Sequence, residues 1–316
     1  MADSAITNRL DQAQRQRPAA AVTVATFKKF QEDRSTRMAS MIAFWAFFSI
    51  FPLFLLLVSV LGFVLPGSTK SNVLHHVAAM FPLLDPNTVG HLSGSWWSVI
   101  LGGATALWSG TAVVRSTEFA FNSVWEIPMN ERPKMVEQLL RAFKALAIIG
   151  VGLVVSTVIS GFITGQSNGV NLGPAARIGG YVIAIVLDVG LFMVAFKMLT
   201  DREISFRDVL PGAVLSGVAF WVLEQVSSFI ISNRLQHAQS TYGHFATVIT
   251  ILWWFYLQAV ITLLGAQLNV VLHHRLHPRS LGDDHTDADR RTLESYAESR
   301  AYEDRERVDT SLPDRG

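Results

Sequence analysis

Residues 38–66 read MASMIAFWAFFSIFPLFLLLVSVLGFVLP, a run without a single Asp, Glu, Lys or Arg. About 20 predominantly apolar residues in a helix cross the hydrocarbon core of a bilayer, so this run predicts a membrane-spanning helix. It begins too far into the chain, and is too long, for a cleaved secretory signal peptide. We therefore expect it to stay in the mature protein as a membrane anchor.

The composition of the whole chain agrees with this reading. Only 16% of the 316 residues are charged and 50% are hydrophobic, whereas about a quarter of the residues of a soluble domain are charged. This balance argues against an ordinary soluble enzyme, and the net charge of +1 gives no sign of nucleic-acid binding. The chain has no Cys, which excludes disulfides, thiolate metal sites and a cysteine nucleophile.

Six stretches are long and apolar enough to span a bilayer as helices. In chain order they are Met38–Leu65, Trp96–Val114, Phe143–Thr164, Ala175–Leu199, Leu210–Ile231 and Phe245–Leu272. The second stretch is the least hydrophobic of the six, because it is rich in Gly, Ser and Thr, yet it contains no charged residue. The sequence therefore predicts an all-α polytopic membrane protein whose six transmembrane helices form one domain over residues 38–272.

The segments outside these stretches differ in their content of Lys and Arg. The leader before residue 38 and the second-to-third and fourth-to-fifth connections hold 15, counting Lys144 and Lys197 at the span ends. The other three connections hold three, namely Lys70, Arg177 and Arg234. Because Lys and Arg concentrate in cytoplasmic loops, both termini should be cytoplasmic.

Two amphipathic surface helices are expected beside the spans. Within the leader, residues 1–37, the pattern over 20–37 fits an interfacial helix with Phe27 toward lipid and Lys28 and Lys29 toward headgroups, the alternative being a solvated leader. Ser71–Leu84 has apolar residues at helical spacing but is too short to span, so we expect it to lie flat on the outer surface.

The C-terminal segment, residues 273–316, is cytoplasmic in this scheme. Residues 281–316 hold 11 of the 25 acidic residues of the chain and almost no large aliphatic residue. Such a segment buries too little apolar area to offset its ordering entropy. The sequence predicts a mostly disordered charged tail with a helical stretch around Arg290–Tyr302, open to a partner that nothing specifies.

Small residues recur at steps of four in two of the spans. They are Gly152, Ser156 and Ser160 in the third, with Gly161 and Gly165 beside them, and Gly212, Ser216, Ala213 and Gly217 in the fifth. Such faces let a neighbouring helix approach closely, within one chain or between two copies of a homo-oligomer. Pro52, in the middle of the first span, removes one backbone hydrogen bond; the resulting kink serves either packing or a cavity.

Ionisable residues inside the spans are the strongest candidates for function, because a charge at bilayer depth is costly. Asp188 lies near the middle of the fourth span, and Glu224 lies about 20 Å along the fifth span from Pro211. Either they line a substrate or proton path, or they are structural hydrogen-bonding groups between helices. A third set at the inner end of the second span shares one helix face by its spacing: Arg115, Glu118 and Asn122.

Several kinds of chemistry lack their motif in this sequence. It has no phosphate-binding loop, no His-Glu-x-x-His zinc motif and no Gly-x-Ser-x-Gly nucleophile elbow. His273, His274 and His277 cluster after the sixth span; a metal site is one interpretation, and interfacial positive charge is the simpler one. We predict no enzymatic activity, no metal and no cofactor.

Several motifs resemble those of the YihY/BrkB family of bacterial inner-membrane proteins. They are Ala43-Phe44-Trp45-Ala46, Phe48-Ser49-Ile50-Phe51-Pro52, Leu107-Trp108-Ser109, Asn122 with Trp125, Leu210-Pro211-Gly212-Ala213, Tyr242-Gly243, Trp253 with Tyr256, and Leu264-Gly265-Ala266. The resemblance covers roughly residues 25–275 and rests on the order and spacing of the motifs. It implies six helices in the plasma (inner) membrane with both ends inside. One departure is Gln267, where the family usually has Glu after Leu-Gly-Ala.

The resemblance implies less about activity. Members have carried the name ribonuclease BN, but this sequence lacks the His-x-His-x-Asp-His cluster of tRNA-processing hydrolases. Other members are linked to serum resistance or to the movement of envelope lipids or small solutes. We expect a transporter or flippase in contact with membrane lipids, with a lipid or small solute as substrate. The alternative is a non-transporting scaffold for envelope integrity, and a membrane-bound nuclease is the least supported reading.

Overall fold

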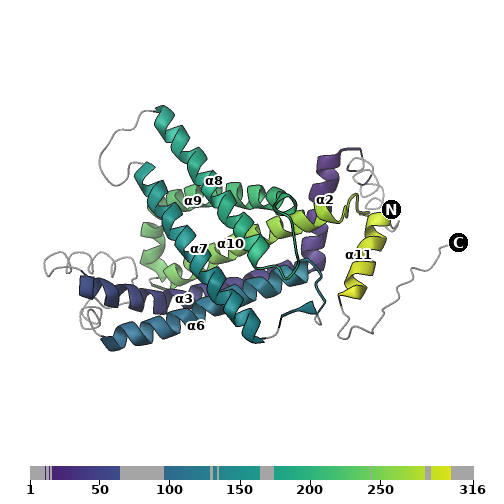
Figure 1. Ribbon diagram of the computed structural model, residues 1–316. Coiled ribbons are helices and arrows are strands. Elements are labelled where there is room, and N and C mark those ends of the chain that lie inside the picture. The colour runs from purple at the N-terminus through teal and green to yellow at the C-terminus, as the bar shows by residue number, and fades with distance from the viewer. Residues whose placement is uncertain are drawn as a thin grey trace. The chain divides into compact units, whose positions relative to one another are not determined.

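The computed structural model describes residues 11, 14, 16–64, 96–128, 131–133, 135–163, 174–242, 244–281 and 286–299. Within these residues the chain is helical and contains no β-strand, which confirms the all-α class (Figure 1). The helices are α2 (Pro18–Glu32), α3 (Ser35–Val64), α6 (Trp96–Val124), α7 (Met135–Ile163), α8 (Pro174–Met198), α9 (Phe206–Tyr242), α10 (His244–His273) and α11 (Asp287–Glu298).

Five helical segments of the described residues are long and apolar enough to cross a membrane. They are Ser35–Leu56, Trp96–Val124, Ile178–Met198, Phe206–Val226 and Val248–His273. These fall on the first, second, fourth, fifth and sixth predicted stretches. The third stretch lies mostly on α7, where the side chains of residues 153–163 are outside the described part, so six spans and the orientation stay predictions.

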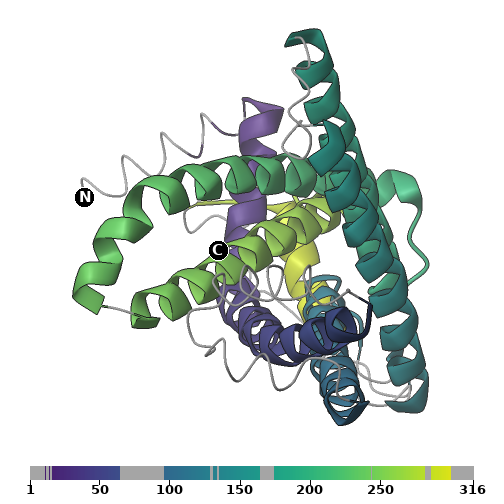
Figure 2. The ribbon, with the colours of Figure 1, turned by 90° about the vertical axis from the view of Figure 1, so that its left-hand side faces the viewer.

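The chain divides into two compact units. The first contains residues 1–39, 117–224 and 258–316, and the second contains residues 40–116 and 225–257. In the first unit, α7 and α8 run alongside each other (Figure 2). Gly152 of α7 lies at this contact, where a Cβ would displace the end of the Leu191 side chain on α8.

A close crossing of α9 and α10 also belongs to the first unit. A Cβ at Gly212 would collide with the carbonyl oxygen of Gly265, so both backbones meet where neither carries a side chain. The Oδ1 atom of Asn269 accepts a 2.6 Å hydrogen bond from the backbone N–H of Gly212. Ser216 donates to the carbonyl of Ile261 at 3.2 Å. The predicted small-residue face of the fifth span is thereby confirmed as a packing face.

Aromatic contacts connect α3 and α6 in the second unit. The ring centroids of Trp45 and Trp108 lie 5.7 Å apart in an edge arrangement, and those of Phe48 and Trp108 lie 6.3 Å apart. A Cβ at Gly102 would lie 2.9 Å from the backbone nitrogen of Leu56, so this glycine sets how closely the helices approach. Helix α3 continues through Pro52, whose side chain is half-buried.

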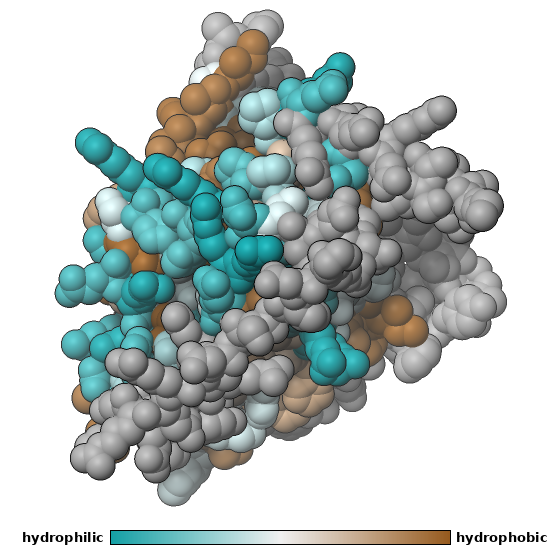
Figure 3. All heavy atoms as spheres, turned by 90° about the vertical axis from the view of Figure 1, so that its right-hand side faces the viewer, coloured by the Kyte–Doolittle hydropathy of each residue, from teal (hydrophilic) through white to brown (hydrophobic). Residues whose placement is uncertain are grey.

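The leader and the tail each contain a helix where the sequence predicted one, but the surroundings of Lys29 differ from the prediction. Helix α2 buries Lys29 completely, instead of presenting it to headgroups, because carboxylates surround its ammonium group. Helix α11 covers most of the helical stretch predicted around Arg290–Tyr302. Hydrophilic residues gather on the face that carries α2 and α11 (Figure 3). The predicted surface helix Ser71–Leu84 lies outside the described residues.

Candidate functional site

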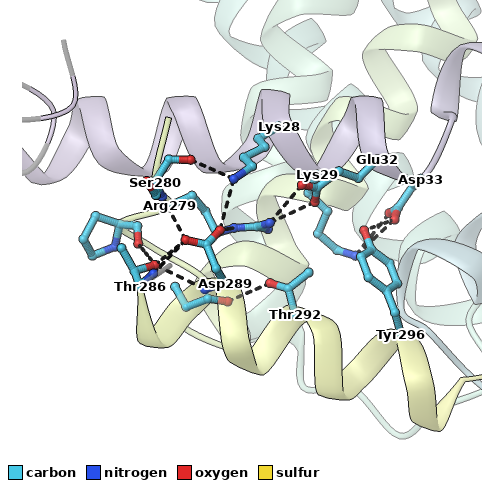
Figure 4. Close-up of polar contacts among 12 residues, drawn as sticks. Lys28, Lys29, Glu32, Asp33, Arg279, Ser280, Thr286, Asp289, Thr292 and Tyr296 are labelled. Carbon is cyan, nitrogen blue, oxygen red and sulfur yellow. Dashed lines mark hydrogen bonds and ion pairs between the residues drawn. The ribbon is translucent and has the colours of Figure 1, made fainter. Parts of the chain in front are cut away.

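A cluster of charged side chains, most of them buried, forms where α2, the segment after α6, the segment after α10 and α11 meet. Figure 4 shows its contacts between α2, the segment after α10 and α11. We call it the α2–α11 cluster. Its members are Lys28, Lys29, Glu32, Asp33, Glu126, Arg279, Asp289 and Tyr296. Bonded partners in this cluster lie up to 263 positions apart in the sequence, and all its members belong to the first unit.

Lys29 occupies the centre of one half of this cluster. Its side chain is 0% exposed, and its Nζ atom pairs with Asp33 at 3.1 Å and with Glu126 in a very short contact. The ring centroid of Tyr296 lies 4.9 Å from the same Nζ. Removing an ammonium group from water is costly unless opposite charges replace its hydration. The two carboxylates and the aromatic ring provide that replacement.

Glu126 reaches Lys29 from an unusual backbone conformation. Its φ of 56° lies in the left-handed region, which residues other than Gly and Asn rarely adopt. The N–H of Ile127 donates to the carbonyl of Asn122 at 2.9 Å, which closes α6 in a Schellman arrangement. Gly is the usual residue at this C′ position. A Glu that stays there at a conformational cost points to a role for its side chain.

Asp33 accepts hydrogen bonds from two further helices. The hydroxyl of Tyr296 on α11 donates to its Oδ1 atom at 2.5 Å, and the amide of Gln267 on α10 donates to its Oδ2 atom at 2.6 Å. Gln267 is fully buried and also lies 3.1 Å from the hydroxyl of Ser35. The departure from the family pattern therefore has a physical account. A Glu at 267 would place another carboxylate against Asp33, whereas Gln supplies a donor.

Arg279 and Asp289 hold the other half of the cluster together. The Nε atom of Arg279 donates to Asp289 at 2.6 Å, and its Nη2 atom contacts both oxygens of Glu32 at 2.9 and 3.0 Å. Lys28 adds a 3.1 Å ion pair to Asp289. Thr286 and Asp289 exchange hydrogen bonds in a capping box that begins α11. Asp289 thus starts the helix and attaches it to α2 at the same time.

The protonation behaviour of the cluster follows from burial and neighbours. Burial raises the pKa of Glu126, because desolvation outweighs the attraction of Lys29. Burial acts in the same direction on Asp289, but hydrogen bonds from the backbone of Thr286 and Ser280 and from Arg279 hold its pKa well below the usual range. Burial, together with the carboxylate of Asp33, raises the pKa of Tyr296, so its hydroxyl remains a donor.

A second polar network contains Asn122, one of the predicted site residues. Its amide donates to Asp201 at 2.5 Å and accepts from the backbone N–H of Asp201 at 2.9 Å. Arg141 of α7 donates to the same carboxylate at 2.6 Å. These reciprocal bonds attach the end of α6 to the segment after α8. On the same face of α6, Glu118 is buried, whereas Arg115 is exposed.

The other two predicted site residues lie on α8 and α9. Asp188 is buried, with 8% of its surface exposed, and Glu224 is exposed. The structure brings them near enough for the charge of one to act on the other. A Cβ at Gly217, two turns before Glu224, would lie 2.7 Å from the side chain of Val189, next to Asp188. The two carboxyl groups therefore belong to one contact between helices.

The histidines after the sixth span pack on Trp125. The rings of His273 and His274 lie 5.5 and 6.0 Å from the ring of Trp125. Burial, the neighbouring His273 and the charges of Arg202 and Lys29 lower the pKa of His274 to about 4. His274 is therefore neutral at physiological pH and does not add the positive charge we expected. In the described part of the chain, no group of three or more His, Cys, Asp or Glu is placed to hold a metal ion.

Sequence reasoning missed most of the α2–α11 cluster. Two local signals were present: the spacing of four between Lys29 and Asp33, which favours pairing on a helix, and the capping-box spacing from Thr286 to Asp289. Neither indicates that Glu126 or Tyr296 completes the site. Those partners are 97 and 263 residues from Lys29 and Asp33, respectively.

Comparison with known proteins gives distant membrane relatives. Similar proteins include the ribonuclease-like protein YfkH of Bacillus subtilis, 23% identical over 180 residues, which is 54% of this chain and 64% of that protein. A UPF0761 membrane protein of Janthinobacterium is 27% identical over 222 residues, or 67% of this chain and 49% of that protein. One from Nitrosospira multiformis is 27% identical over 169 residues, or 52% and 37% of the two chains.

The matched part of these relatives is limited. The alignments cover between about a third and two thirds of the length of the relatives described above. No solved structure matches the chain. A profile of the family described as Virulence factor BrkB matches residues 26–290, which include the five membrane-spanning segments, most of the α2–α11 cluster and both intramembrane carboxylates. The chain is therefore a membrane protein that belongs to the virulence factor BrkB family.

Proposed function

We propose that this chain is a plasma-membrane transporter or flippase that moves a lipid or a small solute. In this proposal six helices span the membrane, both termini are cytoplasmic, and Asp188 and Glu224 line the polar path. The observation that carries the proposal is the position of Glu224 on α9.

One side of α9 is suited to lipid. Exposed apolar residues follow it at steps of four, at Leu210, Val214, Val218, Val222 and Val226. Glu224 follows Ala213 by 11 residues and Gly217 by seven, which at about 100° per residue places all three on one face, on the opposite side of the helix from Val222 and Val226. Ala213 is fully buried and Gly217 packs against α8. Glu224 therefore continues the inward face of the helix.

The side chain of Glu224 is nevertheless exposed, in contrast to the residues before it on the same face. A carboxyl group within a membrane-spanning segment avoids lipid and faces either the interior of the bundle or water. An exposed carboxyl group on the inward face, beside the buried Asp188, is the arrangement expected of a hydrated path. This supports a path in preference to a purely structural pair of hydrogen-bonding groups.

Mass spectrometry of the protein in native-lipid nanodiscs tests this proposal. We expect the wild type to retain a specific lipid or solute and the Glu224→Gln and Asp188→Asn variants to lose it. Glu203→Gln is the matched control, because Glu203 is exposed in the connection between α8 and α9, outside the spans. Equal bound lipid in the wild type and both intramembrane variants would remove Glu224 and Asp188 as path residues.

A scaffold is the second candidate, and the docking of α11 favours it. The cluster fixes the inner side of this helix, while Arg290, Arg291 and Glu294 are exposed on its outer side together with Leu293. A rigidly held helix of this kind can present a surface to a partner. Under this reading, reversing the charges of Arg290 and Arg291 abolishes function, while Glu224→Gln leaves it intact. Membrane-integrity assays on the two variants separate the candidates.

A further inference from the structure

The α2–α11 cluster contains one carboxylate more than its cations can neutralise. Arg279 and Lys28 pair with Glu32 and Asp289, which balances that half. In the other half, Lys29 faces both Asp33 and Glu126, whose side chains are 3% and 4% exposed. Since an uncompensated charge is costly in such surroundings, a buried group of this kind tends to neutralise.

Gln267 reaches this half of the cluster from α10. It is fully buried, and its Nε2 atom donates hydrogen bonds to Asp33 and Ser35. Asp33 is therefore held by donors on α10 and α11 as well as by Lys29.

Of the two carboxyl groups beside Lys29, Glu126 has fewer hydrogen-bond donors among the described residues. Asp33 receives hydrogen bonds from Tyr296 and Gln267 as well as its ion pair with Lys29. For Glu126 the structure shows Lys29 as the hydrogen-bond donor. Its left-handed backbone keeps it in this position at a conformational cost.

The charged and titratable groups around Glu126 come from every element that meets there. Helix α2 contributes Lys29 and Asp33, the segment after α10 contributes Arg279, and α11 contributes Tyr296. His274, near Lys29 at the end of α10, is neutral because its pKa is lowered to about 4. The charge of Arg279 acts with that of Lys29 to favour the ionised form of Glu126, but the burial of Glu126 outweighs both attractions.

We propose that Glu126 is a proton-binding site that empties as pH rises, and that its proton strengthens the attachment of α11 to α2. Loss of the proton leaves two carboxylates, those of Asp33 and Glu126, on the single ammonium group of Lys29. Asp33 is also the acceptor of the hydrogen bond from the Tyr296 hydroxyl. The membrane protein thereby acquires a pH-sensitive contact between α2 and α11. This contact does not depend on the proposed transport path.

The sign of the effect on stability follows from linkage. A carboxyl group with a raised folded-state pKa binds its proton more tightly in the folded protein than in the unfolded chain. The stability that this proton contributes is fully present below the pKa of the group in the unfolded chain. It is lost as pH rises through the pKa of the group in the folded protein. The unfolding equilibrium changes by up to about tenfold per pH unit within that interval.

Hydrogen–deuterium exchange of residues 287–298 in the full-length protein, corrected for the intrinsic effect of pH, tests the proposal. We expect protection of α11 in the wild type to fall by up to about tenfold per unit from mildly acidic to mildly alkaline pH. Glu126→Gln mimics the protonated group and should stay protected throughout. The exposed-site control Glu203→Gln should behave as the wild type.

Three outcomes would overturn the proposal: protection in the wild type that does not change with pH, the same pH dependence in Glu126→Gln, or protection restored at alkaline pH by sodium ions in the wild type alone. The last would mean that a cation, not a proton, occupies the site. If Glu126→Gln does not fold, Glu126→Asp replaces it. The carboxylic-acid infrared band of the Glu126→Asp variant should be shifted from the band of the wild type. A band at the same position in both proteins assigns the proton to another group.

Discussion

Lys29 shows how a charged residue within an apolar chain is accommodated. Its ammonium group is completely removed from water, yet two carboxylates and a tyrosine ring contact it. Its neighbour Lys28 keeps a side chain that is 31% exposed, forms an ion pair with Asp289 and donates to the carbonyl of Ser280 at 2.7 Å. Adjacent lysines on one helix therefore have different energetic roles, although the sequence pattern treats them alike.

Replacing each lysine by methionine separates these roles. We expect Lys29→Met to destabilise the protein by about 3–5 kcal/mol, because Asp33 and Glu126 would remain buried without their cation. Lys28→Met should cost about 1 kcal/mol or less, as expected for a partly exposed pair. Denaturation in detergent, followed by circular dichroism, measures both. Equal losses in the two variants would contradict the central position of Lys29.

At the scale of the helix, α9 and α10 show why glycine is required within a membrane span. Gly212 and Gly265 meet backbone to backbone, and Asn269 bonds to the N–H that follows Pro211. The proline and the glycine both weaken a helix in isolation. In this crossing they gain a close contact and a hydrogen bond between helices, which an isolated helix cannot have.

An alanine substitution measures the value of this contact. We expect Gly212→Ala to destabilise the protein by about 1–3 kcal/mol, because the added methyl group meets the backbone of α10 and the amide of Asn269. Gly190→Ala on α8 is the control, since a Cβ there has no neighbour within 4 Å. Its effect should be neutral or stabilising by up to about 1 kcal/mol. Thermal stability of the two purified variants distinguishes these outcomes.

For the whole molecule, the distribution of Lys and Arg predicts that both termini face the cytoplasm. The absence of Cys makes this directly testable, because any thiol that is introduced is unique. Glu203→Cys should react with an impermeant thiol reagent only after the cells are permeabilised. Ser93→Cys, in the connection between the first two predicted spans, should react in intact cells. The opposite pattern would reverse the orientation.

The features that the sequence predicted are those that depend on local order. Apolar runs placed five spans on helices that the structure describes, and the spacing of Gly212, Ser216 and Gly217 identified a packing face. Asn122, a predicted path residue, bonds to Asp201, a partner 79 positions away that the local spacing does not indicate, and its role in a path stays a prediction. A helical stretch around Arg290–Tyr302 was predicted within the tail, and α11 covers most of it, but composition does not show that Asp289 bonds to Lys28 and Arg279.

Long-range pairing limits such reasoning at the candidate site. Lys29 was placed among headgroups because a lysine on an amphipathic helix usually lies there. Its burial depends on Glu126, at a helix end where Gly is the usual residue, and on Tyr296, which lies on the last described helix. Neither partner is visible from local spacing, since no periodicity relates residues on four separate segments.

The attachment of Tyr296 to Asp33 also sets an order of assembly during synthesis. Asp33 leaves the ribosome soon after Lys29, Glu126 follows much later, and Tyr296 emerges only when 263 residues have been added after Asp33. The pocket around Lys29 cannot close before that moment. A chain that stops short of Tyr296 therefore exposes a buried lysine and its carboxylates to water, which gives the quality-control proteases of the cell a means to distinguish incomplete from finished copies.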